Sequence, residues 1–229
     1  MSPDALFATL ASPSLFWIAD GLGVALLIGY HLMLRRSFRR QPERTYRGRS
    51  NRLRRAWVET MRASGNGILA IQTLRNWVMS ATLFASTAML IGLGVIGKAF
   101  DGVDLAGLSQ ALSLVPSGAA LVRIKLLLLA AIFFGAFLHF ALALRYYNHT
   151  GFLINLPAGH FDGLEVASIA DTLNHAGGHY HHGTRLFLLA VPGVLWLIGP
   201  DWFLGGVFVA LFLLYRFDFR IDQEHDHAA

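Results

Sequence analysis

The sequence predicts an all-α fold, a polytopic bundle of five transmembrane helices with two amphipathic surface helices. Of the 229 residues, 55% are hydrophobic and only 14% are charged, against roughly 25% charged in a typical soluble domain. Apolar runs of about 18 or more residues recur, which is the length that crosses a bilayer. Arginines gather beside the first of these runs. We therefore expect residues 1–229 to form a single integral membrane domain.

The first span is expected at residues 15–34, and a block of arginines follows it. Twelve of the 19 basic residues, all of them arginines, lie between Arg35 and Arg75, where Glu43 and Glu59 are the only acids. Basic residues beside a span are typical of the cytoplasmic side and of contact with anionic headgroups. No nucleic-acid motif accompanies them. We interpret the block as an arginine-rich cytoplasmic face, which places the amino terminus outside.

The segment at residues 41–64 is predicted to be a helix on the membrane surface. Leu53, Trp57 and Met61 are spaced by four and would form its apolar side. "SGNG" at residues 64–67 should then break the helix, because paired glycines disfavour a helix interior.

The second and third spans are expected at residues 77–99 and 121–144, joined by an external loop. Arg123 and Lys125 at the outer end of the third span run against the positive-inside rule, and we expect them to snorkel to the interface. Asp20 in the first span is close enough to the outer interface to be hydrated there, although an ionisable group in a span is also a candidate functional site.

Residues 151–184 are predicted to be a second cytoplasmic surface segment, with an amphipathic helix that carries four of the ten histidines. The last apolar stretch is split by "GPDW" at 199–202, a turn signature. We favour a hairpin of two spans, 185–199 and 201–217, over one kinked helix, which would reduce the count to four. The hairpin returns the carboxyl terminus to the cytoplasm.

Three stretches stand out together: "NGILAIQTLRNWVMSATLFASTAML", "LRYYN" and the run from "NHAGGHYHHGTR" to "LLYRFDF". They resemble a bacterial integral-membrane family, the domain of unknown function 599. The resemblance implies a multi-pass protein of the bacterial inner membrane with a helical bundle, and it implies no activity. The positions that match the family's polar pattern are Asn66, Gln72, Asn76, Ser80, Arg145, Asn148, Asn174, His179 and Arg185.

Two sets of polar residues are candidate sites near the cytoplasmic side. Gln72, Asn76 and Ser80, with Asn66 before them, share one helix face, which would either hydrogen-bond between helices or line the path of a small transporter. The second set, Arg75, Arg145, Arg185 and Asn148, would bind an anion, with lipid phosphate as the simplest ligand. Arginines that only snorkel to the interface are the alternative for this set.

The histidines allow several interpretations. Asp171, His175, His179 and His182 follow one stripe of a helix and would bind a transition metal, respond to pH, or simply face solvent. His31 and His139 lie at similar depth in different spans, which is the arrangement that haem ligation between helices requires.

Catalytic motifs are not evident in the sequence. It has no cysteine, no glycine-rich phosphate loop, no nucleophile elbow and no paired carboxylates at working spacing. We expect a non-enzymatic membrane component that associates with anionic lipid, with a membrane protein partner, or with further copies of itself. A transporter and a metal- or haem-binding protein are the alternatives.

Overall fold

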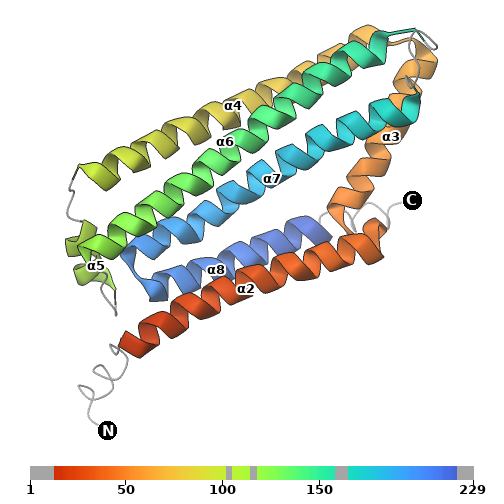
Figure 1. Ribbon diagram of the computed structural model, residues 1–229. Helices are drawn as coiled ribbons and strands as arrows, with labels where there is room; N and C mark the ends of the chain where they lie inside the picture. Colours follow the sequence, from red (N-terminus) through yellow and green to blue (C-terminus); the bar gives the residue numbers. More distant parts are fainter. Residues whose placement is uncertain (1–12, 102–104, 114–117, 158–164, 221–229) are drawn as a thin grey trace.

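The computed structural model describes residues 13–101, 105–113, 118–157 and 165–220, and these residues are helical apart from short connections (Figure 1). Five of the helices are long and apolar enough to cross a membrane, which confirms the predicted all-α polytopic bundle. The elements are α2 (Pro13–Arg40), η1 (Pro42–Arg44), α3 (Tyr46–Ser64), α4 (Gly67–Phe100), α5 (Leu105–Leu112), α6 (Ala119–Asn155), α7 (Val166–Ile198), α8 (Pro200–Tyr215) and the π-helical turn η2 (Arg216–Arg220).

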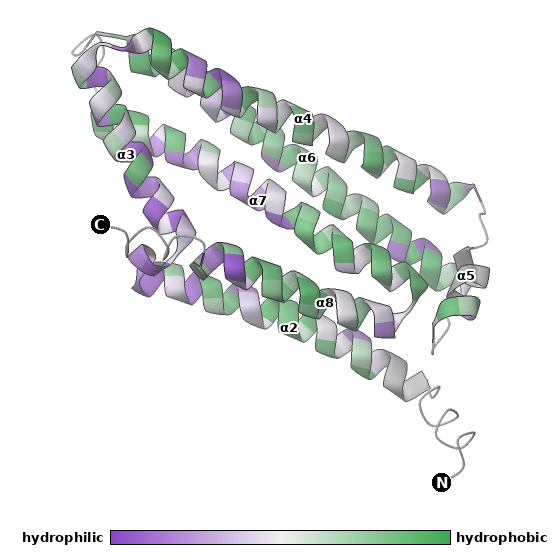
Figure 2. Ribbon diagram, turned by 180° about the vertical axis from the view of Figure 1, so that it is seen from behind, coloured by the Kyte–Doolittle hydropathy of each residue, from purple (hydrophilic) through white to green (hydrophobic). Residues whose placement is uncertain are grey.

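The long helices lie side by side in the order α4, α6, α7, α8 and α2 (Figure 1). The helix α3 crosses one end of this array and connects α2 with α4, while α5 lies at the other end. Hydrophilic residues are concentrated on α3 and on the nearest part of α7, whereas the remainder of the long helices is mostly hydrophobic (Figure 2).

The predicted hairpin at the end of the chain is confirmed. Helix α7 ends at Ile198, and α8 begins at Pro200 and runs back beside it (Figure 1). Proline suits the first position of a helix because its missing N–H would have no partner there. Gly199 joins the two helices in an extended conformation, and a Cβ at this position would collide with the side chain of Ser113. A glycine is therefore required where the end of α5 packs on the turn.

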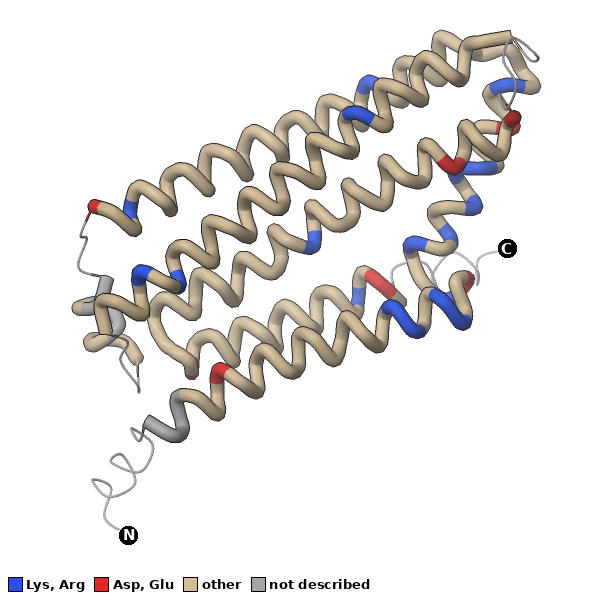
Figure 3. The backbone as a smooth tube through the Cα atoms, viewed as in Figure 1, with Lys and Arg blue, Asp and Glu red and all other residues tan. Residues whose placement is uncertain are grey.

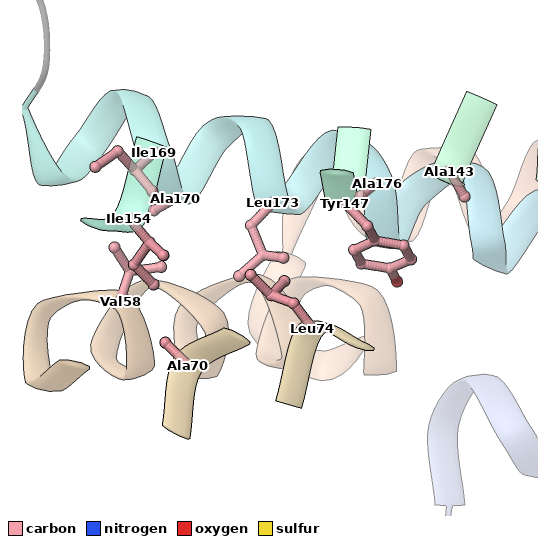
Figure 4. Packing of buried hydrophobic residues seen from close by; sticks show 10 residues of the cluster. All are labelled: Val58, Ala70, Leu74, Ala143, Tyr147, Ile154, Ile169, Ala170, Leu173 and Ala176. Carbon is pink, nitrogen blue, oxygen red and sulfur yellow. The ribbon is translucent and has the colours of Figure 1, made fainter. Parts of the chain in front are cut away.

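The predicted separation of residues 151–184 from the following span is wrong. Helix α6 continues to Asn155, and α7 runs without interruption from Val166 to Ile198. The first half of α7 buries Ile169, Leu173 and Ala176 against α3, α4 and α6 (Figure 4). Its amphipathic pattern therefore reflects packing against other helices of the chain.

The helix predicted at residues 41–64 forms as α3, but its apolar side is shifted from the predicted one. Val58 is fully buried and Trp57 and Met61 pack against the same cluster, whereas 71% of Leu53 is exposed. The helix ends as expected at "SGNG", where Gly65 adopts a φ of 67° that glycine accommodates without strain.

Candidate functional site

A buried ion pair lies where α2, α7 and the end of α8 meet. The guanidinium of Arg185 donates through Nη1 to both carboxylate oxygens of Asp218, at 3.0 and 2.8 Å. The hydroxyl of Tyr30 on α2 donates to the same carboxylate at 2.6 Å, and its ring lies 5.7 Å from Cζ of Arg185. Arg185 is only 5% exposed and Asp218 only 4%. The pair therefore joins three helices through charges that are shielded from solvent.

These contacts do not give every nitrogen of the Arg185 guanidinium a hydrogen-bond acceptor. His181, one turn earlier on α7, places Nε2 3.3 Å from Nη1. The second terminal nitrogen, Nη2, is buried and has no hydrogen-bond partner within the described part of the chain. Buried polar atoms are nearly always hydrogen-bonded, so this guanidinium nitrogen is an exception among the described residues.

Two more arginines reach this region from α3. The guanidinium of Arg54 lies against Gly177 of α7 so closely that a Cβ there would displace it, and Nη2 of Arg47 would lie 3.2 Å from a Cβ at Gly178. Burial lowers the pKa of both arginines below the ordinary arginine value, because desolvation disfavours their charge. Gly177 and Gly178 thus let two cations approach α7.

Two cavities, of about 400 and 550 Å³, meet at this ion pair. Arginines gather along α3 and at the adjoining end of α2 (Figure 3). Four arginines and a single carboxylate are among the lining residues, so cations are in excess. The smaller cavity is lined by His31, Leu34, Arg35, Phe38, Thr45, Arg47, His181, His182, Arg185 and Asp218. The larger cavity is lined by Tyr46, Arg54, Phe84, Gly177, Tyr180, His181, Thr184, Arg185, Phe187, Leu188, Leu214, Phe217 and Asp218.

The other residues of the predicted anion set do not join Arg185. Arg75 is exposed on α4, where it lines a shallow hollow with Gln72 and Asn155, and Arg145 and Asn148 are exposed on α6. The predicted polar face of α4 is exposed as well, with Gln72 beside Asn155 of α6 in that hollow. Its exposed members are Asn66, Gln72, Asn76 and Ser80.

The histidine stripe of α7 contacts α6. Nδ1 of His179 lies 3.0 Å from Nδ1 of His139, so one of the two rings donates to the other. The ring of His182 lies 5.3 Å from that of His139, and His175 stacks on Tyr146. No three His, Asp or Glu side chains of the described residues are grouped so as to hold a metal ion. Asp171 is exposed in the first turns of the helix.

The two histidines suggested for haem have different partners. His31 bonds through Nδ1 to the carbonyl of Leu27 in its own helix and lines the smaller cavity, while His139 pairs with His179 on α7. Sequence spacing placed His31 and His139 at similar depth, but depth alone does not determine which helix faces which.

The far end of the bundle holds a second buried polar cluster, which corrects the expectation for Lys125. Lys125 does not snorkel to the interface, because it is fully buried and donates to the carbonyl of Trp196 at 2.7 Å. The indole of Trp196 donates to the carboxylate of Asp20 at 2.9 Å. Asp20 is 8% exposed and is therefore packed between helices of the protein. This cluster links α2, α6 and α7 at the end opposite to α3.

Sequence comparison places this helical arrangement in a family. The family described as "Protein of unknown function, DUF599" matches residues 18–223. The chain belongs to this family. The match begins within α2, extends past the end of α8 and includes both members of the Arg185–Asp218 pair. No curated protein and no solved structure gives a significant match to the chain.

The sequence alone did not reveal Asp218 as the partner of Arg185. The two residues are 33 positions apart, and no acid lies near Arg185 in the sequence. Only the predicted hairpin could have indicated this pairing. It brings the residues just after 217 back beside the residues just before 186. Arg47 and Arg54 belong to the block of arginines between Arg35 and Arg75, and nothing in the sequence distinguished them from the other members of that block.

Proposed function

We propose that the protein binds a phosphate-bearing anion at Arg185, Arg47 and Arg54 and serves as a non-enzymatic, lipid-associating component of the bacterial inner membrane. The unpaired Nη2 of Arg185 carries this proposal. It belongs to a 5%-exposed guanidinium at the junction of two cavities. A phosphate oxygen would supply the missing acceptor, and the fork of donors in arginine matches the geometry of phosphate.

The charge balance of the site supports an anionic ligand. Asp218 neutralises one arginine, while Arg47 and Arg54 have no carboxylate partner among the described residues. Since burial disfavours their charge, a bound anion would recover part of the cost of desolvation. Basic pockets between membrane-spanning helices bind lipid headgroups in the same way.

The distribution of arginine also supports a membrane orientation. The end of α2, all of α3 and the ends of α6 and α8 lie together, and this is the end that carries most of the arginines (Figure 3). By the positive-inside rule we place this end in the cytoplasm, with the start of α2 on the outer side.

The proposal can be tested by native mass spectrometry of protein purified in a neutral detergent and titrated with phosphatidylglycerol or phosphatidylcholine. We expect selective binding of phosphatidylglycerol, weakened roughly tenfold or more in Arg47→Gln and Arg54→Gln, because each loses a charge-assisted hydrogen bond. Arg75→Gln and Arg145→Gln change exposed arginines outside the cavities and serve as matched controls. Equal binding of both lipids by every variant would refute the proposal. A loss confined to the two control variants would move the site to the exposed arginines.

A further inference from the structure

The larger cavity changes character along its length. Its residues on α7 extend from Gly177 to Leu188, and at 1.5 Å per residue this is about 16 Å, or three helical turns. Arg54 lies against Gly177 at the α3 end, and Arg185 follows two turns later. The apolar part of the wall consists of Phe84, Phe187, Leu188, Leu214 and Phe217. The wall is completed by the polar residues Tyr46, Tyr180, His181, Thr184 and Asp218.

The apolar wall lies among helices that span the membrane. It is formed by α4, α7 and the α8 region, three of the five candidate spans. The smaller cavity differs, because Leu34 and Phe38 are the apolar residues of its wall, beside three arginines and three histidines. Along α7, the larger cavity therefore has Arg54 at its α3 end and Arg185 two turns later, and the apolar Phe187 and Leu188 follow beyond Arg185.

We infer that the ligand is an amphiphile with an acyl chain, a phospholipid whose phosphate contacts Arg54 and Arg185 while one chain lies along Phe187, Leu188 and Leu214. This inference rests on the proposed function and names the class of ligand for the same site. A free phosphate ion would satisfy the arginines but would leave the apolar wall without a partner. A volume of about 550 Å³ lies within the roughly 300–1,000 Å³ of pockets that enclose small ligands.

A substitution at Leu188 would change only the part of the cavity in which we expect the acyl chain. It is half-buried, lines only the larger cavity and lies on the opposite side of Arg185 from Gly177 along α7. Leu188→Trp should fill the space beside the chain and leave the arginines in place. Leu128→Trp makes the same change at a leucine of α6 that is 49% exposed and lines neither cavity, so it controls for the added indole.

The decisive experiment compares a ligand with a chain and one without. Protein in phosphatidylcholine nanodiscs is titrated with lysophosphatidylglycerol that carries a photoreactive diazirine at the chain end, and separately with glycerol phosphate. We expect Leu188→Trp to weaken binding of the lysolipid roughly tenfold, the effect of removing about two buried methylene groups. Glycerol phosphate binding should be unchanged, and Leu128→Trp should bind both ligands like the wild type.

Photocrosslinking then locates the chain. After illumination, peptide mass spectrometry should find the label on Phe187, Leu188 or Leu214. Labels confined to exposed residues, with Leu188→Trp binding like the wild type, would overturn the inference. The proposed function would still stand in that case if Arg54→Gln weakened binding of glycerol phosphate. If the label is confined to exposed residues, Leu188→Trp binds like the wild type and Arg54→Gln also leaves glycerol phosphate binding unchanged, both the inference and the proposed function are refuted.

Discussion

Replacing Asp218 by asparagine isolates the energetic role of the buried ion pair. The substitution keeps the shape of the side chain but removes the charge that faces Arg185. The carboxylate accepts two hydrogen bonds from Nη1 of Arg185 and one from Tyr30, and both charged residues are about 5% exposed. Removing one member of such a pair leaves an uncompensated buried charge, which typically costs about 3–5 kcal/mol.

We expect Asp218→Asn to lower the free energy of unfolding by about 3 kcal/mol, the lower end of that range. Asparagine retains one oxygen that can still accept from Tyr30, whereas its amide N–H group would face the donors of Arg185. Arg185→Met should cost a similar amount, because it leaves the carboxylate buried without its cation. Tyr30→Phe removes one hydrogen bond to a charged acceptor and should cost about 1.5–3 kcal/mol.

The double variant Arg185→Met/Asp218→Asn distinguishes an ion pair from two independent structural roles. In the double variant, the second substitution removes the charge that the first leaves unpaired. The double variant should therefore lose much less unfolding free energy than the sum of the losses in the two single variants. A coupling energy of about 3 kcal/mol, the upper end for neighbouring residues, is expected. Unfolding in mixed micelles of mild and denaturing detergent measures all four free energies. Strict additivity, or a cost below about 1 kcal/mol for Asp218→Asn, would refute the reasoning.

Two further predictions concern packing and the second polar cluster. Gly183→Ala should lower stability by about 1–3 kcal/mol, because the added methyl would lie 2.8 Å from the ring of Phe140, which is fully buried and cannot move away. Gly94→Ala, with no atom within 4 Å of the new Cβ, should be neutral or up to about 1 kcal/mol stabilising in the same unfolding assay. Lys125→Met should cost about 1–3 kcal/mol, because it leaves the carbonyl of Trp196 without its donor. A wild-type unfolding curve for Lys125→Met would contradict the buried position of this lysine, and equal effects of the two glycine variants would contradict the helix contact.

The secondary structure and the number of spans could be read from local sequence patterns. Apolar runs determine where a helix can cross a bilayer, and the turn at Gly199 and Pro200 follows from the chemistry of two neighbouring residues. The break at Gly65 has the same kind of local cause. These features depend on a few consecutive residues, so tertiary context changes them little.

Local sequence patterns could not decide whether an amphipathic helix lies on the membrane surface or packs against other helices of the protein. The first half of α7 alternates apolar and polar residues like a helix on a membrane surface. It has this pattern because Leu173 and Ala176 face α3 and α6 on one side. Periodicity shows that a helix has an apolar face but does not show whether lipid or protein covers it.

The candidate site was determined by tertiary structure. The sequence by itself predicted a multi-pass helical protein with most of its arginines gathered beside the first span. Only packing decided that Arg185 pairs with Asp218, that Gly177 receives the guanidinium of Arg54, and that His139 meets His179 instead of His31. Hydropathy and charge are properties of single residues that add along the chain. An ion pair or a cavity depends on the rotation and register of helices against one another, which are set by side-chain packing between segments far apart in the sequence.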